Sequence, residues 1–261
     1  MDTRAVRRVE RRPDAVVDPE AWPATVPAVA HLLAHGLDLP AGVTFLVGEN
    51  GAGKSTVVEA VAELLGIPPE GGSTAHRAGA DRGRGSDRSG LAGLLRVVRG
   101  AGGRHGRQGF FLRAETAHRF VTYLEDAGAR GDGPPAPHPL HRLSHGEQFT
   151  EVLATQRWTG AARVVLLDEP ESAMSFQNHL ALAGTLAAMA RRGTQVLCAT
   201  HSPLLTAVPG ALVLQLDDDG IHRAEWEDLD VVHHWRFFLD APERYLRHVL
   251  PPAQGAPDEG R

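Results

Sequence analysis

The amino-acid sequence predicts an α/β fold in which a mainly parallel sheet is covered by helices on both faces. Three short apolar runs, without alternating polar residues, have the composition of strands that are buried on both sides: 43–47, 163–167 and 195–200. Residues with helical spacing follow the first two runs, at 53–65 and 176–191. Strands that alternate with helices in this way are typical of a parallel sheet flanked by helices.

The first part of the chain is less regular. Residues 1–40 are rich in proline and charge, and we expect loops, a helix over 26–34 and room for an edge strand. Residues 69–108 are rich in glycine and arginine, and only 91–98 has helical spacing. We interpret 69–108 as a surface segment of a lid; the alternative is a contact to the phosphate backbone of a nucleic acid through the arginines between 77 and 107.

The second half of the chain is predicted to complete the same domain. We expect a strand at 109–112, helices at 115–127 and 146–158, a Gly/Pro loop at 128–142 and a hairpin at 211–225. Two helical pieces and a flexible tail at 251–261 follow. The sequence therefore predicts one domain over 1–250, with a small helical and irregular lid at about 67–145 and an antiparallel edge.

The composition excludes several classes of protein. The chain has 261 residues, of which 42% are hydrophobic, so a sizeable core is expected, and its net charge of −5 gives no overall attraction to nucleic acid or anionic lipid. No apolar stretch reaches the roughly 18 residues of a membrane helix, and the charged N-terminus lacks the apolar segment of a secretory signal. Cys198 is the only cysteine, which excludes an internal disulfide and makes the cytoplasm the expected location.

A glycine-rich turn joins the strand at 43–47 to the helix at 53–65, and it matches the phosphate-binding pattern G-x-x-x-x-G-K-[ST]. Its glycines let successive main-chain N–H groups point at phosphate oxygens, next to the positive end of the helix dipole. Lys54 is the only lysine among 27 basic residues and would contact the β- and γ-phosphates, while Ser55 would bind Mg²⁺. We predict ATP binding by Gly48, Glu49, Asn50, Gly51, Ala52, Gly53, Lys54, Ser55 and Thr56.

Carboxylates follow the second buried run, and a histidine ends the third. Parallel strands place their carboxyl ends at one edge of the sheet, so Asp168, Glu169 and His201 are expected beside the phosphate-binding turn. Asp168 would hold Mg²⁺ with Ser55, and Glu169 would accept a proton from the attacking water. His201 would reach the γ-phosphate. The alternatives are a solvated acidic turn and a structural histidine.

The order of these segments resembles ABC-type ATPases, because Leu-Ser-His-Gly-Glu-Gln at 143–148 stands between the phosphate-binding turn and Leu-Leu-Asp-Glu-Pro, and Ala-Thr-His-Ser follows. More narrowly, the chain is similar to small bacterial ATPases of AAA-family type, which also carry Phe-Phe-Leu-Arg-Ala-Glu (110–115) and a Pro-Glu-Arg-Tyr-Leu-like segment (242–246). The resemblance covers roughly 20–250. It implies a P-loop NTPase fold and a homodimer that closes around two ATP molecules.

The resemblance also implies a signature that contacts the γ-phosphate of the ATP bound by the other subunit. Its residues here are Ser144, His145, Gly146 and Glu147, and Ser144 would also serve as an ordinary helix cap. The family has Gly-Gly after the serine, whereas this chain has His145 first. Gln108 is the candidate for the family's Q-loop glutamine. Trp22 is the candidate for stacking on adenine, with core packing as the alternative.

We expect a Mg²⁺-dependent ATPase that uses the dimer as a conformational switch and acts on an unknown protein partner. About 90 residues separate Lys54 from Ser144, too few for the coiled-coil arms of chromosome-maintenance ATPases. Three alternatives stay open: the ATP-binding subunit of a membrane importer, a nucleic-acid-stimulated ATPase, and an interaction module that binds ATP without appreciable turnover.

Overall fold

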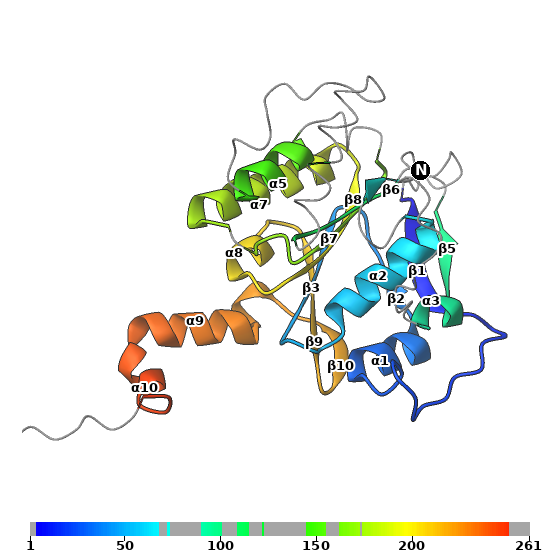
Figure 1. Cartoon of the computed structure of the whole chain (residues 1–261), viewed down its shortest axis with the longest axis horizontal. Helices are drawn as coiled ribbons and strands as arrows, with labels where there is room; N and C mark the ends of the chain where they lie inside the picture. The colour runs from blue at the N-terminus through cyan, green and yellow to red at the C-terminus, as the bar shows by residue number, and fades with distance from the viewer. Residues whose placement is uncertain are drawn as a thin grey trace, which may run out of the picture.

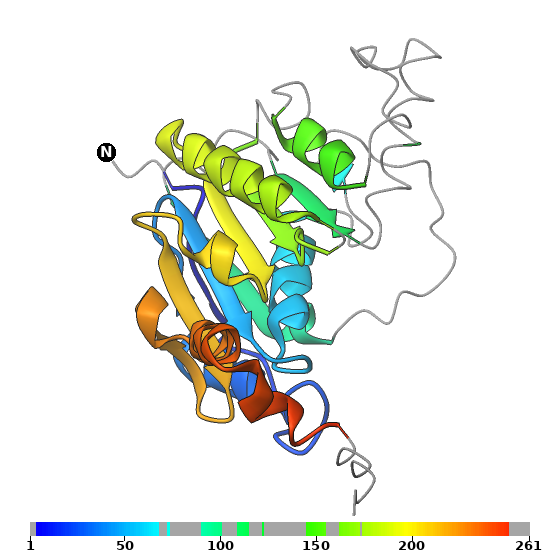
Figure 2. The same cartoon turned by 90° about the vertical axis from the view of Figure 1, so that its left-hand side faces the viewer.

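A seven-stranded sheet forms the centre of the molecule (Figures 1 and 2). The computed structural model describes residues 4–67, 72–73, 90–100, 109–114, 122, 145–154, 162–172 and 174–250. In spatial order the strands are β10 (Gly220–Arg223), β9 (Leu212–Asp217), β3 (Val43–Gly48), β8 (Gln195–Thr200), β7 (Val164–Asp168), β6 (Gly109–Arg113) and β4 (Gly72–Ser73). The five strands from β9 to β6 are parallel, and β10 and β4 are antiparallel edges. The predicted mainly parallel sheet and the hairpin at 211–225 are therefore confirmed.

Helices cover both faces of this sheet. One face packs against α1 (Pro27–His35) and α2 (Lys54–Leu65), and the other against α5 (His145–Ala154), α7 (Phe176–Arg191) and α8 (Pro203–Thr206). Successive residues of β3 point to opposite faces, so Leu46 lies in the first core while Phe45 and Val47 lie in the second. Burial on both sides explains why the strands are continuous apolar runs.

A second, three-stranded antiparallel sheet lies beside the first core. Its order is β2 (Leu37–Asp38), β1 (Val6–Arg11) and β5 (Leu95–Arg99), and Gln195 of β8 joins it to the central sheet. The side-chain amide of Gln195 donates to the carbonyl oxygens of Val6, Leu39 and Pro40, and its oxygen accepts from the Val6 N–H.

The expected helix over 91–98 is wrong in its second half. Only α3 (Leu91–Leu94) is helical, and the chain then continues as β5. The residues of β5 pair with β1, and this long-range pairing, favoured by Val97 and Val98, outweighs the local helical spacing. The helices at 26–34 and 53–65 are confirmed with shifts of one residue. The predicted helix at 115–127, the loop at 128–142 and the tail at 251–261 lie almost wholly outside the part of the chain that the structure describes.

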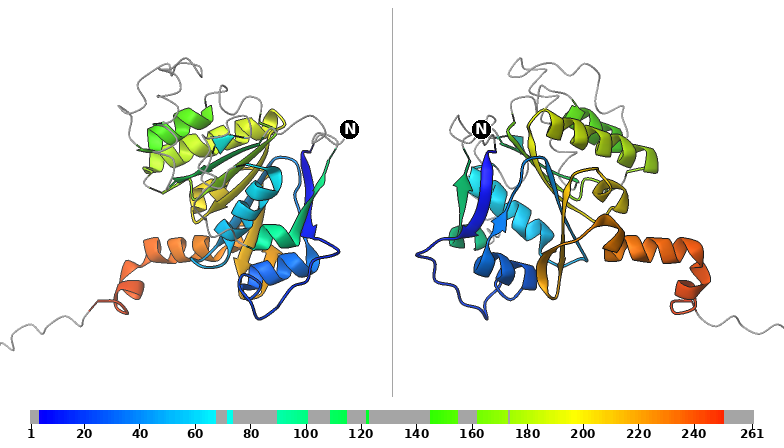
Figure 3. Two further views of the ribbon diagram at one scale, coloured as in Figure 1. Left: turned by 45° about the vertical axis from the view of Figure 1, so that its right-hand side comes forward. Right: turned by 180° about the vertical axis from the view of Figure 1, so that it is seen from behind.

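The C-terminal part leaves the body of the molecule. After η3 (Trp226–Asp228), the helix α9 (Asp230–Asp240) extends away from the sheet, and α10 (Pro242–Leu246) lies at its far end (Figures 1 and 3). Within the described ranges, no helix combines the length and apolar character needed to cross a membrane.

Candidate nucleotide-binding site

The turn between β3 and α2 has the conformation that its glycines permit. Gly51 has φ +85° and Gly53, which caps α2, has φ +93°, both in the region that disfavours residues with a Cβ. Gly48 is needed for a different reason, because a Cβ there would lie 2.2 Å from the carbonyl oxygen of Leu216 in β9. The turn therefore lies against β9 and exposes its main-chain N–H groups at the start of a helix, which is the geometry of an anion site.

Lys54 is the first residue of α2, directly after this turn. Its side chain is 4% exposed, and its Nζ donates hydrogen bonds to the carbonyl oxygens of Gly48 and Glu49, both at 2.9 Å. Burial lowers the pKa of Lys54, while nearby carboxylates, Glu169 first among them, favour the charged form. The ammonium is thus held by two carbonyl oxygens of the loop, in the field of the carboxylates of Glu169, Asp168 and Glu171.

Asp168 and Ser55 meet at the carboxyl edge of the sheet. The Ser55 hydroxyl, in the first turn of α2, donates to Asp168 Oδ1 at 2.9 Å. Asp168 ends β7 and is 4% exposed, and burial raises its pKa to about 6 against the opposing effects of Ser55 and Arg113. The structure therefore brings together the two residues that the sequence predicts as ligands of one ion.

Arg113 is a member of this site that the sequence analysis did not single out. It ends β6 directly opposite Asp168 in the parallel register, with its Nε 3.2 Å from Asp168 Oδ2 and its NH1 2.5 Å from Glu59 of α2. Gly109 begins β6 opposite Val164, at the other end of both strands. Arg113 thus occupies the site edge of β6, while the predicted Q-loop residue Gln108, which precedes Gly109, is not among the described residues.

Glu169 and His201 form a second pair beside the turn. The Nε2 atom of His201 lies 3.1 Å from Glu169 Oε1, at the ends of β8 and β7. Glu169 has φ +48°, a conformation that costs about 1–3 kcal/mol for a residue other than glycine, and its N–H is held by the carbonyl of Ala199 at 2.9 Å. At this point the chain leaves the extended conformation of β7, and the Glu169 side chain lies beside His201.

Glu171 fixes the segment that carries His201. Its Oε1 accepts hydrogen bonds from the Thr200 hydroxyl and from the His201 main-chain N–H, both at 2.6 Å. The Thr200 hydroxyl in turn accepts from the Ser202 N–H at 3.0 Å. The resemblance to ABC-type ATPases implies that residues 171–175 form a loop that couples the two sites of a dimer, but it does not predict these contacts of Glu171, which depend on the neighbouring strand.

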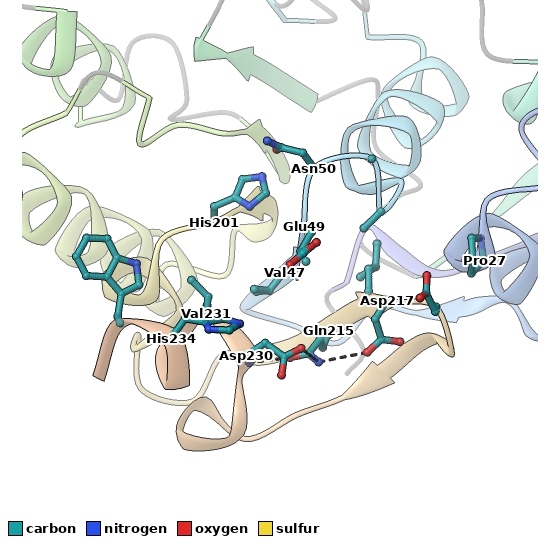
Figure 4. Close-up of a pocket in the computed structure, with 16 residues that line it drawn as sticks. Pro27, Val47, Glu49, Asn50, His201, Gln215, Asp217, Asp230, Val231 and His234 are labelled. Carbon is teal, nitrogen blue, oxygen red and sulfur yellow. Dashed lines mark hydrogen bonds between the residues drawn. The ribbon is translucent and has the colours of Figure 1, made fainter. Parts of the chain in front are cut away.

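A pocket of about 650 Å³ opens in front of the turn (Figure 4). The turn residues 47–52 form one wall, and His201 lies close to Asn50 at one side. The end of β9 and the start of α9 form the opposite wall, where the Gln215 amide donates to Asp217 at 3.2 Å and to Asp230 at 2.8 Å. The pocket therefore lies between the turn on one side and the junction of β9 with α9 on the other.

Several residues that the sequence predicts for the site are not among the residues that line this pocket. Trp22 is 60% exposed, so the alternative that it packs in the core is wrong, and adenine stacking stays a prediction. Ser144 lies outside the residues described. His145 and Gly146 begin α5, Glu147 is exposed in its first turn, and α5 packs against α7. No described residue of α5 lines the pocket, so a role of the signature in its own subunit has no support here.

The family model described as "AAA domain, putative AbiEii toxin, Type IV TA system" matches residues 130–207, from before α5 to just beyond His201. Three solved structures have similar folds. The first, "An inward-facing conformation of a putative metal-chelate type ABC transporter", is 19% identical with a TM-score of 0.44, and the match covers 76% of this chain and 80% of that chain. The second, cbiO1 of the ABC transporter complex cbiONQ from Clostridium perfringens, is 16% identical with a TM-score of 0.43, and the match covers 82% of this chain and 90% of that chain. The third, the SMC head domain from Thermotoga maritima, is 16% identical with a TM-score of 0.41, and the match covers 73% of this chain and 93% of that chain. No curated protein matches the sequence.

Proposed function

We propose that this chain is a P-loop NTPase of the AAA/ABC type, which binds Mg²⁺-ATP and hydrolyses it to ADP and phosphate; a model of an AAA family matches its residues 130–207. One observation carries the proposal. Lys54, the Ser55–Asp168 pair and the Glu169–His201 pair come from three different elements and meet at one edge of the sheet, beside an open pocket. Each pair has a separate task in phosphoryl transfer to water, and a turn that merely resembled a P-loop would need neither.

The residues present fit a magnesium ion. Mg²⁺ prefers oxygen ligands and is usually held by one or two carboxylates together with waters and substrate phosphates. Asp168 supplies one carboxylate and Ser55 a hydroxyl oxygen, and the two atoms Ser55 Oγ and Asp168 Oδ1 lie 2.9 Å apart. When bound there, the ion would neutralise charge on the β- and γ-phosphates. The ionised form of Asp168 would be required, and Arg113 favours that form.

Glu169 is our candidate for the general base. Its carboxylate would accept a proton from the attacking water, and His201, 3.1 Å away, would hold that carboxylate in place and sense the γ-phosphate. Lys54 would exchange its two carbonyl partners for the β- and γ-phosphates. The main-chain amides of the turn would hold the remaining oxygens.

Dimerisation is the second part of the proposal. We infer that two copies close on two ATP molecules, so that α5 of one subunit completes the site of the other. The support is that α5 packs on α7 and that no described residue of α5 lines the pocket in its own chain. ATP would favour the closed pair because it contacts both subunits only in that state.

The test is the variant Glu169→Gln, with Glu225→Gln as the control. Glu225 is an exposed surface residue, so the control makes the same chemical change away from the site. We expect Glu169→Gln to bind ATP and to turn it over at least about a hundredfold more slowly than the wild type. We also expect ATP to convert this variant into a closed dimer, which is detected as a change in particle mass or compactness. Steady-state phosphate release and light scattering measure these two quantities. If the wild-type chain releases no phosphate from ATP, the proposed ATPase activity is refuted. If ATP does not change the light scattering of Glu169→Gln, the proposed closing dimer is refuted.

A further inference from the structure

The helices α9 and α10, together with residues up to 250, form a C-terminal arm (230–250) that extends from the body of the molecule (Figures 1 and 3). Val232 is the only residue of α9 that is buried. The arm has seven large apolar side chains that are 36–75% exposed: Trp235, Phe237, Phe238, Leu239, Leu246, Val249 and Leu250. Single exposed apolar residues are common on protein surfaces, whereas a group of them within one segment is typical of an interface.

The arm has a defined shape of its own. His234 of α9 and the Tyr245 hydroxyl of α10 lie within hydrogen-bond distance, at 2.9 Å, and the Phe238 and Tyr245 rings meet edge to face at 6.0 Å. These contacts hold α10 against α9. An apolar surface that is ordered before binding loses less conformational entropy on association than a disordered tail would.

The size of the apolar surface matches half of a protein interface. Seven side chains of this kind at these exposures present on the order of 700 Å², against about 800 Å² per partner in a standard protein–protein interface. The largest apolar patch on a typical monomer is about 300–600 Å². The arm therefore exposes, in total, about as much apolar surface as one side of a protein–protein interface buries.

The charges of the arm favour a second copy of this chain over a strongly charged partner. The arm contains three arginines and three acidic residues, so its formal charge balances, and a neutral apolar surface has no electrostatic preference for nucleic acid or anionic lipid. The base of the arm also lies at the nucleotide pocket, because His234 and Trp235 are part of its lining. The arm therefore leaves the body on the face that the closing dimer would use.

We propose that the C-terminal arms of two copies pack together and hold the chain as a dimer in the absence of nucleotide. ATP would then close two subunits that are already joined. Joining them makes closure an intramolecular step, with an effective concentration that does not depend on how dilute the protein is. This consequence for turnover rests on the proposed function, whereas the nucleotide-free dimer does not.

The test compares the full-length wild-type chain with Phe237→Asp/Leu239→Asp, using Val16→Asp as the control. Val16 is 90% exposed and lies far from the arm in sequence, so the control adds the same charge to another exposed apolar position. Neither Phe237 nor Leu239 lines the pocket. We expect the wild type and Val16→Asp to sediment as dimers without nucleotide over a wide concentration range, and the arm variant to sediment as a monomer with unchanged far-UV circular dichroism.

Turnover gives the second measurement. For the wild type, turnover per chain stays constant on dilution, whereas for the arm variant it falls roughly in proportion to protein concentration at the dilute end. A wild type that is monomeric without nucleotide would overturn the proposal, and so would an arm variant that remains dimeric. If the aspartates disturb folding, Phe237→Ser/Leu239→Ser gives the same comparison without added charge. A wild-type dimer without ATPase activity would refute the proposed function and leave the arm dimer standing.

Discussion

The change Glu171→Ala tests how the loop after β8 is held. Glu171 accepts two hydrogen bonds at 2.6 Å, from the hydroxyl of the fully buried Thr200 and from the His201 N–H. Each bond to a charged acceptor contributes about 1.5–3 kcal/mol, and part of this is offset because the alanine variant no longer keeps a half-buried carboxylate away from water. We expect the free energy of unfolding to fall by about 2–3 kcal/mol.

The matched variant is Glu171→Gln. Its amide oxygen can accept the same two bonds as a neutral group, so the expected loss is about 1 kcal/mol. Urea unfolding followed by circular dichroism measures both variants. A loss below about 0.5 kcal/mol for the alanine variant, or an equal loss for both variants, would show that the two hydrogen bonds do not hold this loop.

Turnover separates a general loss of stability from a loss of position at His201. If Glu171 acts through His201, Glu171→Ala lowers turnover by about ten- to a hundredfold at a temperature where the variant is folded. Added to His201→Ala, the same change then has little further effect, because the residue that it positions is gone. Two effects that multiply in the double variant would instead assign Glu171 a separate role.

Three further predictions concern the sheet junction, the metal site and the turn. Gln195→Leu removes the four main-chain hydrogen bonds of the buried amide, so the free energy of unfolding measured in urea should fall by about 3 kcal/mol; a loss under about 1 kcal/mol would contradict this. Because protonated Asp168 cannot bind Mg²⁺, the Mg²⁺ concentration for half-maximal turnover should rise about tenfold per pH unit below about 6 and stay level above it; a flat profile would show that Asp168 is not a ligand. Gly48→Ala should weaken ATP binding at least tenfold in a calorimetric titration, because its Cβ would meet the Leu216 carbonyl oxygen, whereas Gly184→Ala in α7 meets nothing within 4 Å and should leave affinity unchanged.

Much of the fold could be predicted because its strands carry their own signal. Burial on both faces makes 43–47, 163–167 and 195–200 continuously apolar, and a strand of that kind is recognisable without knowing its neighbours. The segment 91–98 has no such signal. Its Leu and Val spacing suits a helix, and only pairing with β1, which is more than 80 residues away in the chain, makes 95–99 a strand.

The site divides in the same way. The Ser55–Asp168 contact could be predicted, because a phosphate-binding turn and a carboxylate at a strand end have a fixed relation in this kind of fold. The ion pair of Arg113 with Asp168 depends on the register between β6 and β7, which the sequence does not reveal. The hydrogen bonds of Glu171 could not be foreseen for the same reason, since their donors lie at the end of β8 and directly after it.

The lone lysine has a practical consequence. Since every other basic side chain except histidine is arginine, a reagent that acylates amines meets only one side-chain target in the whole chain, and that target lies in the phosphate-binding turn. Its lowered pKa makes the free amine more available, while its 4% exposure makes the reaction slow. The extent of modification, read by mass spectrometry, would therefore report occupancy of the turn directly, without a radioactive or fluorescent nucleotide.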